Sequence, residues 1–224
     1  MPAKRRAAIN HRLVRGAKQA RVVTPPPREV NGITIEPSAT ADVWMVGSSF
    51  MTRARQQLSP QRPELVPHKK ILWLARGGLR WNDLDRVIDA QVEATRRSPS
   101  AVVIHLGSND LGSTKTSQLL IDMETSIMRI QAHLPNTHVC FSGILQRRYW
   151  HSARDPRKVE KSRSKLNRRL ANRLRDLPKF SFIPHPRIVA TDRSWFQWEG
   201  IHLSCKGIVA FVKDIDHALV QIFK

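Results

Sequence analysis

The sequence predicts an α/β fold of three layers, in which helices cover both faces of a five-stranded, mostly parallel sheet. Three observations support this prediction. Apolar runs of strand length recur along the chain, segments with helical periodicity lie between them, and glycine-rich polar loops follow several of the runs. Strands that are apolar throughout and alternate with amphipathic helices are typical of a parallel sheet buried on both sides. The hydrophobic content of 41% is sufficient for such a core.

The expected elements follow one another without an internal repeat. The five predicted strands cover residues 43–47, 70–74, 101–106, 138–143 and 180–184, and the five predicted helices cover residues 49–58, 81–97, 116–133, 158–177 and 206–222. In the second helix, Leu84, Val87, Ile88 and Val92 recur at helical spacing, and Asn82 is expected to be its N-cap.

Residues 1–40 differ in composition from residues 41–224, which we expect to form the folded domain. The first part is predicted to be a disordered basic tail that ends in a proline-rich linker, "TPPPRE". Its basic residues include Lys4, Arg5, Arg6, Arg12, Arg15, Lys18 and Arg21. Residues 5–21 have the composition of a short helix that could form on an anionic partner.

The formal net charge of +20 predicts contact with a polyanion. Thirty-eight Lys and Arg residues face only eighteen Asp and Glu residues, and such an excess attracts anionic partners. Nucleic acid is the commonest partner of this kind, and an anionic lipid surface is the second candidate. On the predicted helix 158–177, Arg168 and Arg169 are either phosphate contacts or part of an ordinary solvated face.

Several classes of protein are disfavoured by the composition. No apolar stretch is long enough to cross a membrane, and the basic N-terminus lacks the apolar segment of a secretory signal. Two cysteines, Cys140 and Cys205, do not make a disulfide framework, and both are expected in the core. We therefore expect an intracellular protein, cytoplasmic or nuclear. The nine histidines show no metal-ligand spacing with a cysteine, so neither a metal nor a cofactor is expected.

Residues able to do chemistry follow the predicted strands. Ser48 and Ser49 come after the first strand, "RGGL" after the second, and "HLGSNDLG" spans the end of the third. Glu199 and His202, in "WFQWEGIHLS", precede the last helix. The carboxyl ends of parallel strands meet at one edge of the sheet, where ligands bind in open α/β folds. These segments are therefore expected to converge.

This combination resembles the SGNH (GDSL-type) hydrolase family over about residues 42–222, and the family's fold is the flavodoxin-like, three-layer arrangement expected here. The resemblance implies that Ser49 is the nucleophile and His202 the general base. It also implies that Gly78, or Gly77 if the register slips, is a backbone donor of the oxyanion hole, together with the amide of Asn109. Glu199 stands where the family usually has Asp, and Ser48 replaces the Asp that precedes the nucleophile.

The chemistry of these residue types fits the implied roles. A serine hydroxyl needs an imidazole to accept its proton, and the imidazole needs an acceptor that sets its tautomer. At the start of a helix the Ser49 N–H can also face an oxyanion, as can an unobstructed glycine amide or an asparagine side chain. Two neighbouring segments have open roles: residues 147–158 form either a lip over the pocket or an exposed loop, and Trp195, Phe196 and Trp198 either wall the pocket or fill the core.

Two function classes follow. The first is a serine esterase that cleaves short, acetyl-type esters through an acyl-enzyme at Ser49, with the basic tail bound to a polyanion. The second is a weakly active or inactive nucleic-acid-binding protein that uses the same fold as a scaffold. SGNH-like domains occur in proteins of some retrotransposons, so the resemblance also allows an origin in a mobile element. The acyl substrate and the oligomeric state are left open.

Overall fold

A five-stranded parallel sheet forms the centre of the protein. The computed structural model describes residues 26–37, 40–58, 65–66, 68–95, 97–150 and 155–224. The strand order is β4-β3-β5-β6-β7, with β3 (Val43–Gly47) between β4 (Ile71–Ala75) and β5 (Ala101–His105), followed by β6 (His138–Ser142) and β7 (Phe180–Ile183). All four pairings are parallel. The predicted tail residues Lys4, Arg5, Arg6, Arg12, Arg15, Lys18 and Arg21 lie outside the described residues.

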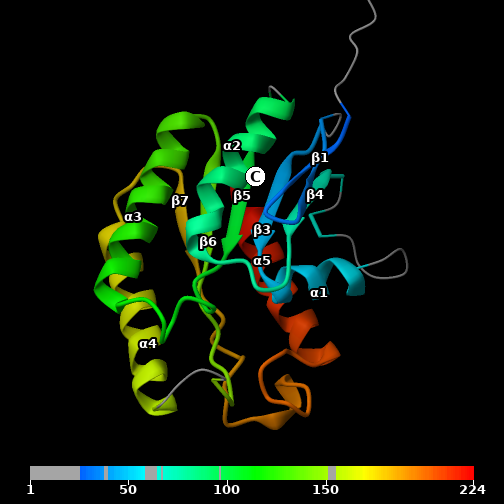
Figure 1. Ribbon diagram of the computed structural model, residues 1–224. Coiled ribbons are helices and arrows are strands. Elements are labelled where there is room, and N and C mark those ends of the chain that lie inside the picture. Colours follow the sequence, from blue (N-terminus) through cyan, green and yellow to red (C-terminus); the bar gives the residue numbers. More distant parts are fainter. Residues whose placement is uncertain (1–25, 38–39, 59–64, 67, 96, 151–154) are drawn as a thin grey trace, which may run out of the picture.

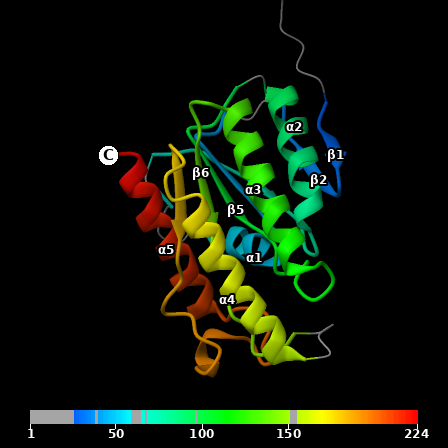
Figure 2. The same cartoon turned by 90° about the vertical axis from the view of Figure 1, so that its left-hand side faces the viewer.

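Helices cover both faces of the sheet, which confirms the predicted three-layer architecture (Figures 1 and 2). Helices α2 (Leu84–Thr95), α3 (Thr116–His133) and α4 (Pro156–Arg173) pack on one face. Helices α1 (Ser49–Gln57) and α5 (Cys205–Ile222) pack on the other. Two short 3-10 helices, η1 (Trp81–Asp83) and η2 (Arg193–Trp195), belong to the connections. No helix of the described residues is both long and apolar enough to span a membrane.

A small hairpin precedes the sheet, at residues that the sequence analysis placed in the linker. Strands β1 (Arg28–Val30) and β2 (Ile33–Ile35) pair antiparallel around Asn31 and Gly32, which have φ of 50° and 69°. An Asn-Gly pair with both φ values positive is the usual two-residue hairpin turn. Ile33 and Ile35 are buried in the same core as α2. The part of the chain that belongs to the folded core therefore begins earlier than expected.

The helix ends differ from prediction in two places. Asn82 is not an N-cap, because it lies inside η1; Arg80 occupies the cap, and its backbone N–H donates to the Asp83 carboxylate at 3.1 Å. Helix α4 begins at Pro156 rather than at residue 158. The Asp155 carboxylate accepts from the first free backbone N–H groups, and proline is well suited to the first turn.

Of the cysteine and aromatic residues for which a place in the core was considered, only some are buried there. Cys140 is buried in β6, where burial raises the pKa of its thiol to about 12. Cys205 is exposed at the start of α5, so its expected place in the core is wrong. Phe196 is buried in the core beside α5, whereas Trp198 is 96% exposed and lies outside that core.

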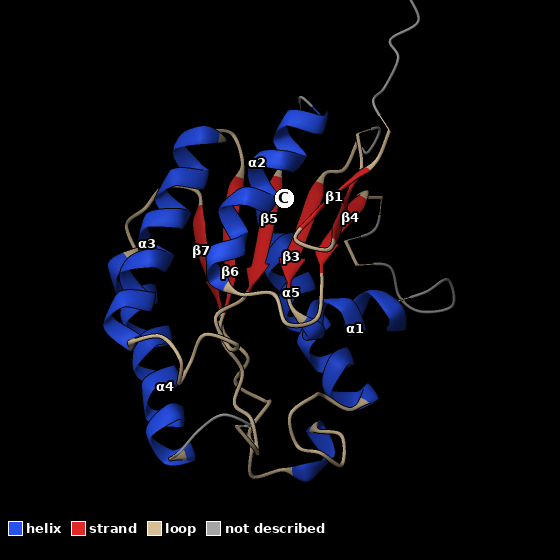
Figure 3. Ribbon diagram, in the orientation of Figure 1, coloured by secondary structure: helices blue, strands red, loops and turns tan. Residues whose placement is uncertain are grey.

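The strand register brings the reactive segments to one edge. Gly47, the last residue of β3, pairs with Ala75 of β4 and with His105 of β5. The residues that follow these three positions therefore leave the sheet side by side, and the strand arrows in Figure 3 point to the edge where the loops gather. Gly47 also leaves no space for a side chain, since a Cβ there would lie 2.3 Å from Met51 Cγ and 2.9 Å from the His105 carbonyl oxygen.

Candidate active site

Ser49 is presented where β3 passes into α1. It is the first helical residue, and Ser48 is the N-cap. The Ser49 side chain is partly exposed, and its hydroxyl makes no hydrogen bond to another residue in the described part of the chain. Ser48 is buried, and its hydroxyl has no partner there either. Of the two hydroxyls, only that of Ser49 is accessible to a substrate.

Glu199 and His202 form a tight pair in the loop before α5. His202 Nδ1 and Glu199 Oε1 are 2.6 Å apart, and the His202 backbone N–H donates to the same oxygen at 3.2 Å. Both side chains are largely covered, with exposed fractions of 26% and 21%. Because the carboxylate accepts the Nδ1 proton, Nε2 is left as the basic nitrogen of the neutral imidazole.

The pKa of His202 is held below its usual value of 6.5. Partial burial is the main cause, and the positive charges of Arg53 and Arg147 act in the same direction. The hydrogen bond from the imidazole to Glu199 opposes this effect without cancelling it. Burial on its own would raise the pKa of Glu199, but its hydrogen bonds lower it, so the carboxylate is charged at neutral pH. His202 is therefore a neutral base at neutral pH.

The residues around His202 include two that lie close to Ser49 on α1. Phe50 directly follows Ser49, and its ring centroid lies 6.2 Å from that of the imidazole. Arg53, whose charge acts on His202, lies one helical turn after Ser49 on α1. The serine hydroxyl and the imidazole are not hydrogen-bonded in this structure, as is common in enzymes without substrate. The tertiary fold nevertheless brings the start of α1 and the loop of His202, which are 153 positions apart in sequence, next to each other.

The loops that carry Gly78 and Asn109, two of the predicted oxyanion donors, are joined by a hydrogen bond. Asn109 Nδ2 donates to the carbonyl oxygen of Leu79, the neighbour of Gly78, at 3.0 Å. An asparagine amide carries two N–H groups, so one is left for a ligand. Gly78 has a φ of 78°, and no atom lies within 4 Å of where its Cβ would be. Its positive φ explains the need for glycine at this turn.

Asp110, next to Asn109 in the loop after β5, also bonds to the segment after β4. Its carboxylate accepts from the Trp81 backbone N–H at 3.1 Å, and burial raises the pKa of the Asp110 carboxyl. The loop after β5 is thus tied to the segment after β4 by three hydrogen bonds: one from Asn109, one to Asp110, and one from the Arg80 guanidinium to Ser113 Oγ at 3.1 Å. This bracing limits the motion of both proposed donors.

Arg147 begins the segment 147–158 that was predicted as a possible lip, although no individual role was predicted for it. It lies in the connection after β6, and its guanidinium donates to Ser108 Oγ at 2.8 Å. The guanidinium carbon lies 5.6 Å from the Phe50 ring centroid and 5.2 Å from that of Trp150. Arg147 and Trp150 therefore lie beside the site, whereas residues 151–154 of the predicted lip lie outside the described residues and residues 156–158 belong to α4. Arg53 was not predicted as a site residue, because an arginine within a helix gives no local signal of such a role.

A second set of Ser, His and Asp side chains lies behind the site. Ser142 Oγ is 2.9 Å from His105 Nδ1 and 2.8 Å from His185 Nε2, and His185 Nδ1 is 3.0 Å from Asp214 Oδ2. Ser142 is completely buried, and burial lowers the pKa of His105 to about 3. A hydroxyl without access to solvent cannot react with a substrate. This series of hydrogen-bonded side chains therefore links β5, β6 and α5 rather than forming a reactive centre. Its rings pack against Phe211.

The remaining predicted residues have other places. Arg168 and Arg169 are exposed on α4. Within the residues that the structure describes, no group of three or more His, Cys, Asp or Glu side chains is arranged to hold a metal ion.

A sequence model of the GDSL-like lipase/acylhydrolase family matches residues 38–207, which is most of the chain and includes every residue of the site described above. The chain belongs to this family. The match begins just before β3 and ends inside α5, so it covers the whole parallel sheet. A search of curated proteins found no significant match.

Solved structures with similar folds include several esterases and lipases. A GDSL-like lipase from Bacteroides thetaiotaomicron has a TM-score of 0.65 at 15% identity, covering 80% of this chain and 87% of that chain. A lipase/acylhydrolase from Enterococcus faecalis has a TM-score of 0.57 at 15% identity, covering 79% and 94%. A carbohydrate esterase family 3 structure from Talaromyces cellulolyticus has a TM-score of 0.56 at 15% identity, covering 82% and 98%. At such identities the likeness concerns the fold.

Proposed function

We propose that the protein is a serine esterase that cleaves short, acetyl-type esters through an acyl-enzyme at Ser49. The observation that carries this proposal is the 2.6 Å hydrogen bond between His202 Nδ1 and Glu199 Oε1. It orients the imidazole and leaves Nε2 free to accept a proton, as the proposed mechanism requires. Family membership, the accessible Ser49 hydroxyl and the Gly78 and Asn109 pair support the same proposal.

In the proposed reaction, Ser49 Oγ attacks the ester carbonyl carbon while its proton passes to His202 Nε2. The negative charge that develops on the carbonyl oxygen is stabilised by the N–H groups of Ser49, Gly78 and Asn109. The C–O bond of the ester then breaks, and the leaving alcohol takes the proton from Nε2. Water repeats the sequence on the acyl-enzyme, again with His202 as the base, and releases the acid and free Ser49.

Two positions differ from the usual family pattern and bear on the rate. Ser48 replaces an Asp, and its buried hydroxyl has no described partner, so it does not brace the turn. Glu199 replaces an Asp, and its Oε1 still reaches the imidazole, whereas Oε2 is buried without a partner. The longer side chain therefore keeps the contact on which the proposed mechanism depends.

The direct test is labelling of the full chain with a fluorophosphonate probe, followed by peptide mass spectrometry, together with turnover of p-nitrophenyl acetate. Covalent labelling at Ser49 with measurable turnover is the expected result. A purified, folded protein that neither reacts with the probe nor hydrolyses the ester would exclude the esterase function.

Replacing Asn109 with alanine is expected to lower kcat by roughly 10²- to 10³-fold, because one oxyanion donor is lost. KM should change little, since the donor acts mainly on charge that develops in the transition state. Steady-state kinetics on p-nitrophenyl acetate give both constants. The thermal midpoint should be measured in parallel, because the Asn109 amide also bonds to Leu79. A raised KM with unchanged kcat would contradict the assigned role.

The pH profile of kcat/KM should show an acid limb whose apparent pKa lies below 6.5. The reaction needs neutral His202, and burial together with Arg53 and Arg147 lowers its pKa. The rate should therefore rise as the pH passes through this lowered value and be constant around neutrality. In Arg53→Met, one source of the lowering is removed, so the limb should move to higher pH. A limb that stays in place in this variant would show that Arg53 does not act on the base.

A polyanion-binding function is the second candidate, and the exposed face of α4 favours it. Lys161, Lys165, Arg168 and Arg169 are exposed there, and no ion pair to any of them is found among the described residues. Such a row of unpaired cations suits a phosphate backbone. With the basic residues 4–21, it would form the sequence-independent contact surface of a nucleic-acid-binding protein, whether of cellular or of mobile-element origin.

The test is binding of labelled single- and double-stranded oligonucleotides, and of anionic vesicles, over a range of salt concentrations. Nucleic-acid binding should weaken steeply with salt, and Lys165→Gln/Arg168→Gln/Arg169→Gln should reduce the slope of log K against log salt by about 0.9 for each phosphate that the protein no longer neutralises. Binding to vesicles alone would assign the surface to lipid, and no binding at low salt would dismiss both partners.

A further inference from the structure

We propose that Arg147 binds an anionic group of the substrate, so that the site prefers esters that carry a carboxylate or a phosphate close to the scissile bond. This inference rests on the proposed esterase function and adds a substrate class to it.

The position of Arg147 suggests this role. Its guanidinium donates to Ser108, the neighbour of the proposed oxyanion donor Asn109, and stacks over Phe50, the neighbour of the proposed nucleophile Ser49. It is also one of the charges that act on His202. A single side chain thus contacts the segments that carry two of the reacting groups and influences the third.

Within the part of the chain that the structure describes, no carboxylate pairs with this cation. No ion pair of Arg147 is found among the described residues, and its only hydrogen bond there is the one to the Ser108 hydroxyl. Its Nε atom is buried without a partner, and burial lowers the pKa of the guanidinium to about 10. A largely buried charge without a counter-ion is unfavourable, and an anionic ligand would offset that cost.

Two other partly buried arginines have counter-ions, whereas Arg53, Arg76 and Arg148 show no ion pair among the described residues. Arg163 pairs with Glu160 at 2.6 Å, and Arg129 pairs with Asp89 at 3.0 Å. Arg147 differs from them, although it is held in the region where an ester would bind. The carboxylate of the adjacent histidine loop, Glu199, is already engaged with His202. An anionic ligand would supply the counter-ion that the described residues do not give this cation.

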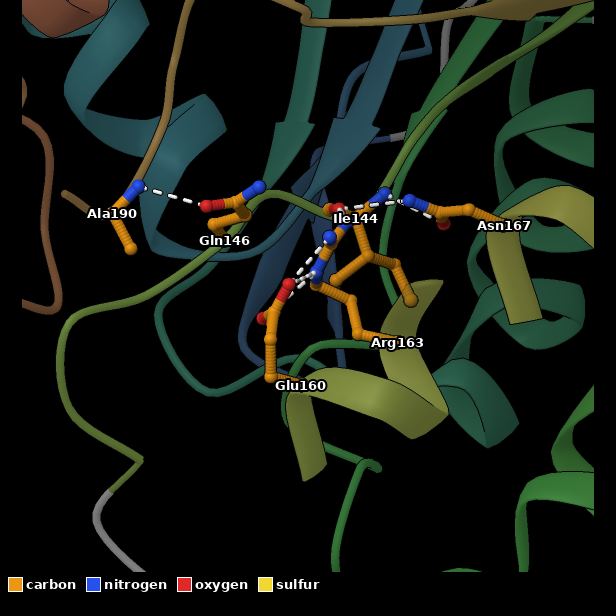
Figure 4. A network of polar contacts seen from close by, with 6 residues as sticks. All are labelled: Ile144, Gln146, Glu160, Arg163, Asn167 and Ala190. Carbon is orange, nitrogen blue, oxygen red and sulfur yellow. Dashed lines mark hydrogen bonds and ion pairs between the residues drawn. The ribbon is translucent and has the colours of Figure 1, made fainter. Parts of the chain in front are cut away.

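The connection that carries Arg147 is anchored on both sides. Before it, the Ile144 carbonyl accepts from Arg163 at 2.8 Å and from Asn167 at 2.9 Å, and Gln146 Oε1 accepts from the Ala190 N–H at 2.8 Å (Figure 4). After it, the Arg148 N–H donates to the Gly200 carbonyl at 2.9 Å. The guanidinium is therefore held in position before a ligand arrives, which reduces the entropic cost of binding.

The connection is also matched to the histidine loop in shape. A Cβ at Gly200, between Glu199 and His202, would lie 2.8 Å from Arg148 Cβ and 2.6 Å from the Tyr149 ring. The close approach that glycine allows lets residues 147–149 pack directly on the loop of the proposed base. This packing fixes the position of Arg147 relative to His202. A residue that selects substrates needs such a fixed position relative to the reacting groups.

The experiment compares matched anionic and neutral esters. In the acyl arm, mono-p-nitrophenyl succinate is compared with p-nitrophenyl pentanoate; in the alcohol arm, 4-acetoxybenzoate and 4-acetoxyphenyl phosphate are compared with methyl 4-acetoxybenzoate. The wild type should prefer the anionic ester in at least one arm, by about 10- to 100-fold in kcat/KM, as expected for a charge-assisted hydrogen bond. The phosphate and carboxylate esters show which anion is preferred.

Arg147→Met should bring the ratio of kcat/KM for the anionic ester to kcat/KM for the neutral ester close to one, and Arg147→Lys should restore part of the preference. Arg157→Met, at an exposed position of α4, is the charge-matched control and should keep the preference. An equal loss on both esters in Arg147→Met, or no preference in the wild type, would overturn the inference while Ser49-dependent turnover of the neutral ester still supports the esterase. If no ester is turned over, the esterase proposal fails, and calorimetric titration with succinate and phosphate tests the anion site by itself. Binding by the wild type that is lost in Arg147→Met would support the site. No binding by the wild type would refute it.

Discussion

Replacing Ser49 with alanine is expected to lower kcat for p-nitrophenyl acetate by about 10⁴- to 10⁶-fold, the range found when a serine nucleophile is removed. The hydroxyl supplies the bond to the acyl group, and no other group described at this site can do so: Ser48 and Ser142 are buried. Residual turnover would come from the oxyanion donors and from water activated by His202. Steady-state kinetics and loss of fluorophosphonate labelling measure the effect. The fold should be unaffected, because the Ser49 hydroxyl makes no hydrogen bond to other described residues.

Ser48→Ala is the matched control for this variant. It removes a neighbouring hydroxyl that is buried, has no described partner and does not cap α1. Removing an unsatisfied buried hydroxyl is not expected to destabilise the protein. Full labelling and turnover in Ser48→Ala, with neither in Ser49→Ala, would establish Ser49 as the nucleophile. The reverse pattern would show that the nucleophile is misassigned by one residue.

Glu199→Gln is expected to lower kcat by roughly 10⁴-fold, by analogy with the neutral replacement of the acid in other serine hydrolase triads. In one arrangement the amide donates an N–H to His202 Nδ1, which forces the wrong tautomer of the imidazole. In the other, the amide oxygen accepts from Nδ1, and the NH₂ group is buried at the position of Glu199 Oε2, which has no partner. In both arrangements the negative charge that stabilises the imidazolium is lost. The acid limb of the pH profile should also move to lower pH, since Glu199 raises the pKa of His202.

The control for the acidic position is Glu93→Gln, which breaks an exposed ion pair with Arg28 and should leave kcat unchanged. Glu199→Asp is the rescue variant, because it restores the charge with the family's usual side chain. Wild-type rates in Glu199→Gln, with an unchanged thermal midpoint, would mean that His202 does not depend on this carboxylate and that the proposed triad is wrong.

The regular elements of the sheet and its helices could be predicted because their signals are local. The apolar runs at 43–47 and 101–106 are of strand length, and the spacing of Leu84, Val87 and Ile88 is helical, so periodicity is sufficient to place them. The hairpin at residues 28–35 has only three residues per strand, too few for periodicity to be visible. Its Asn31-Gly32 turn was the available signal, and the neighbouring prolines obscured it.

The parallel α/β architecture and the common edge where the candidate segments meet could be predicted from the sequence, because parallel strands must end at one edge. The choice of Ser49, Gly78 or Gly77, Asn109, Glu199 and His202 within those segments came from the resemblance to the SGNH family. The tertiary structure was needed to show that Arg147 and Arg53 border this site, that Arg147 has no counter-ion among the described residues, and that the Ser142 hydroxyl is buried. Burial and charge pairing depend on contacts between segments far apart in the chain, and no local pattern encodes them.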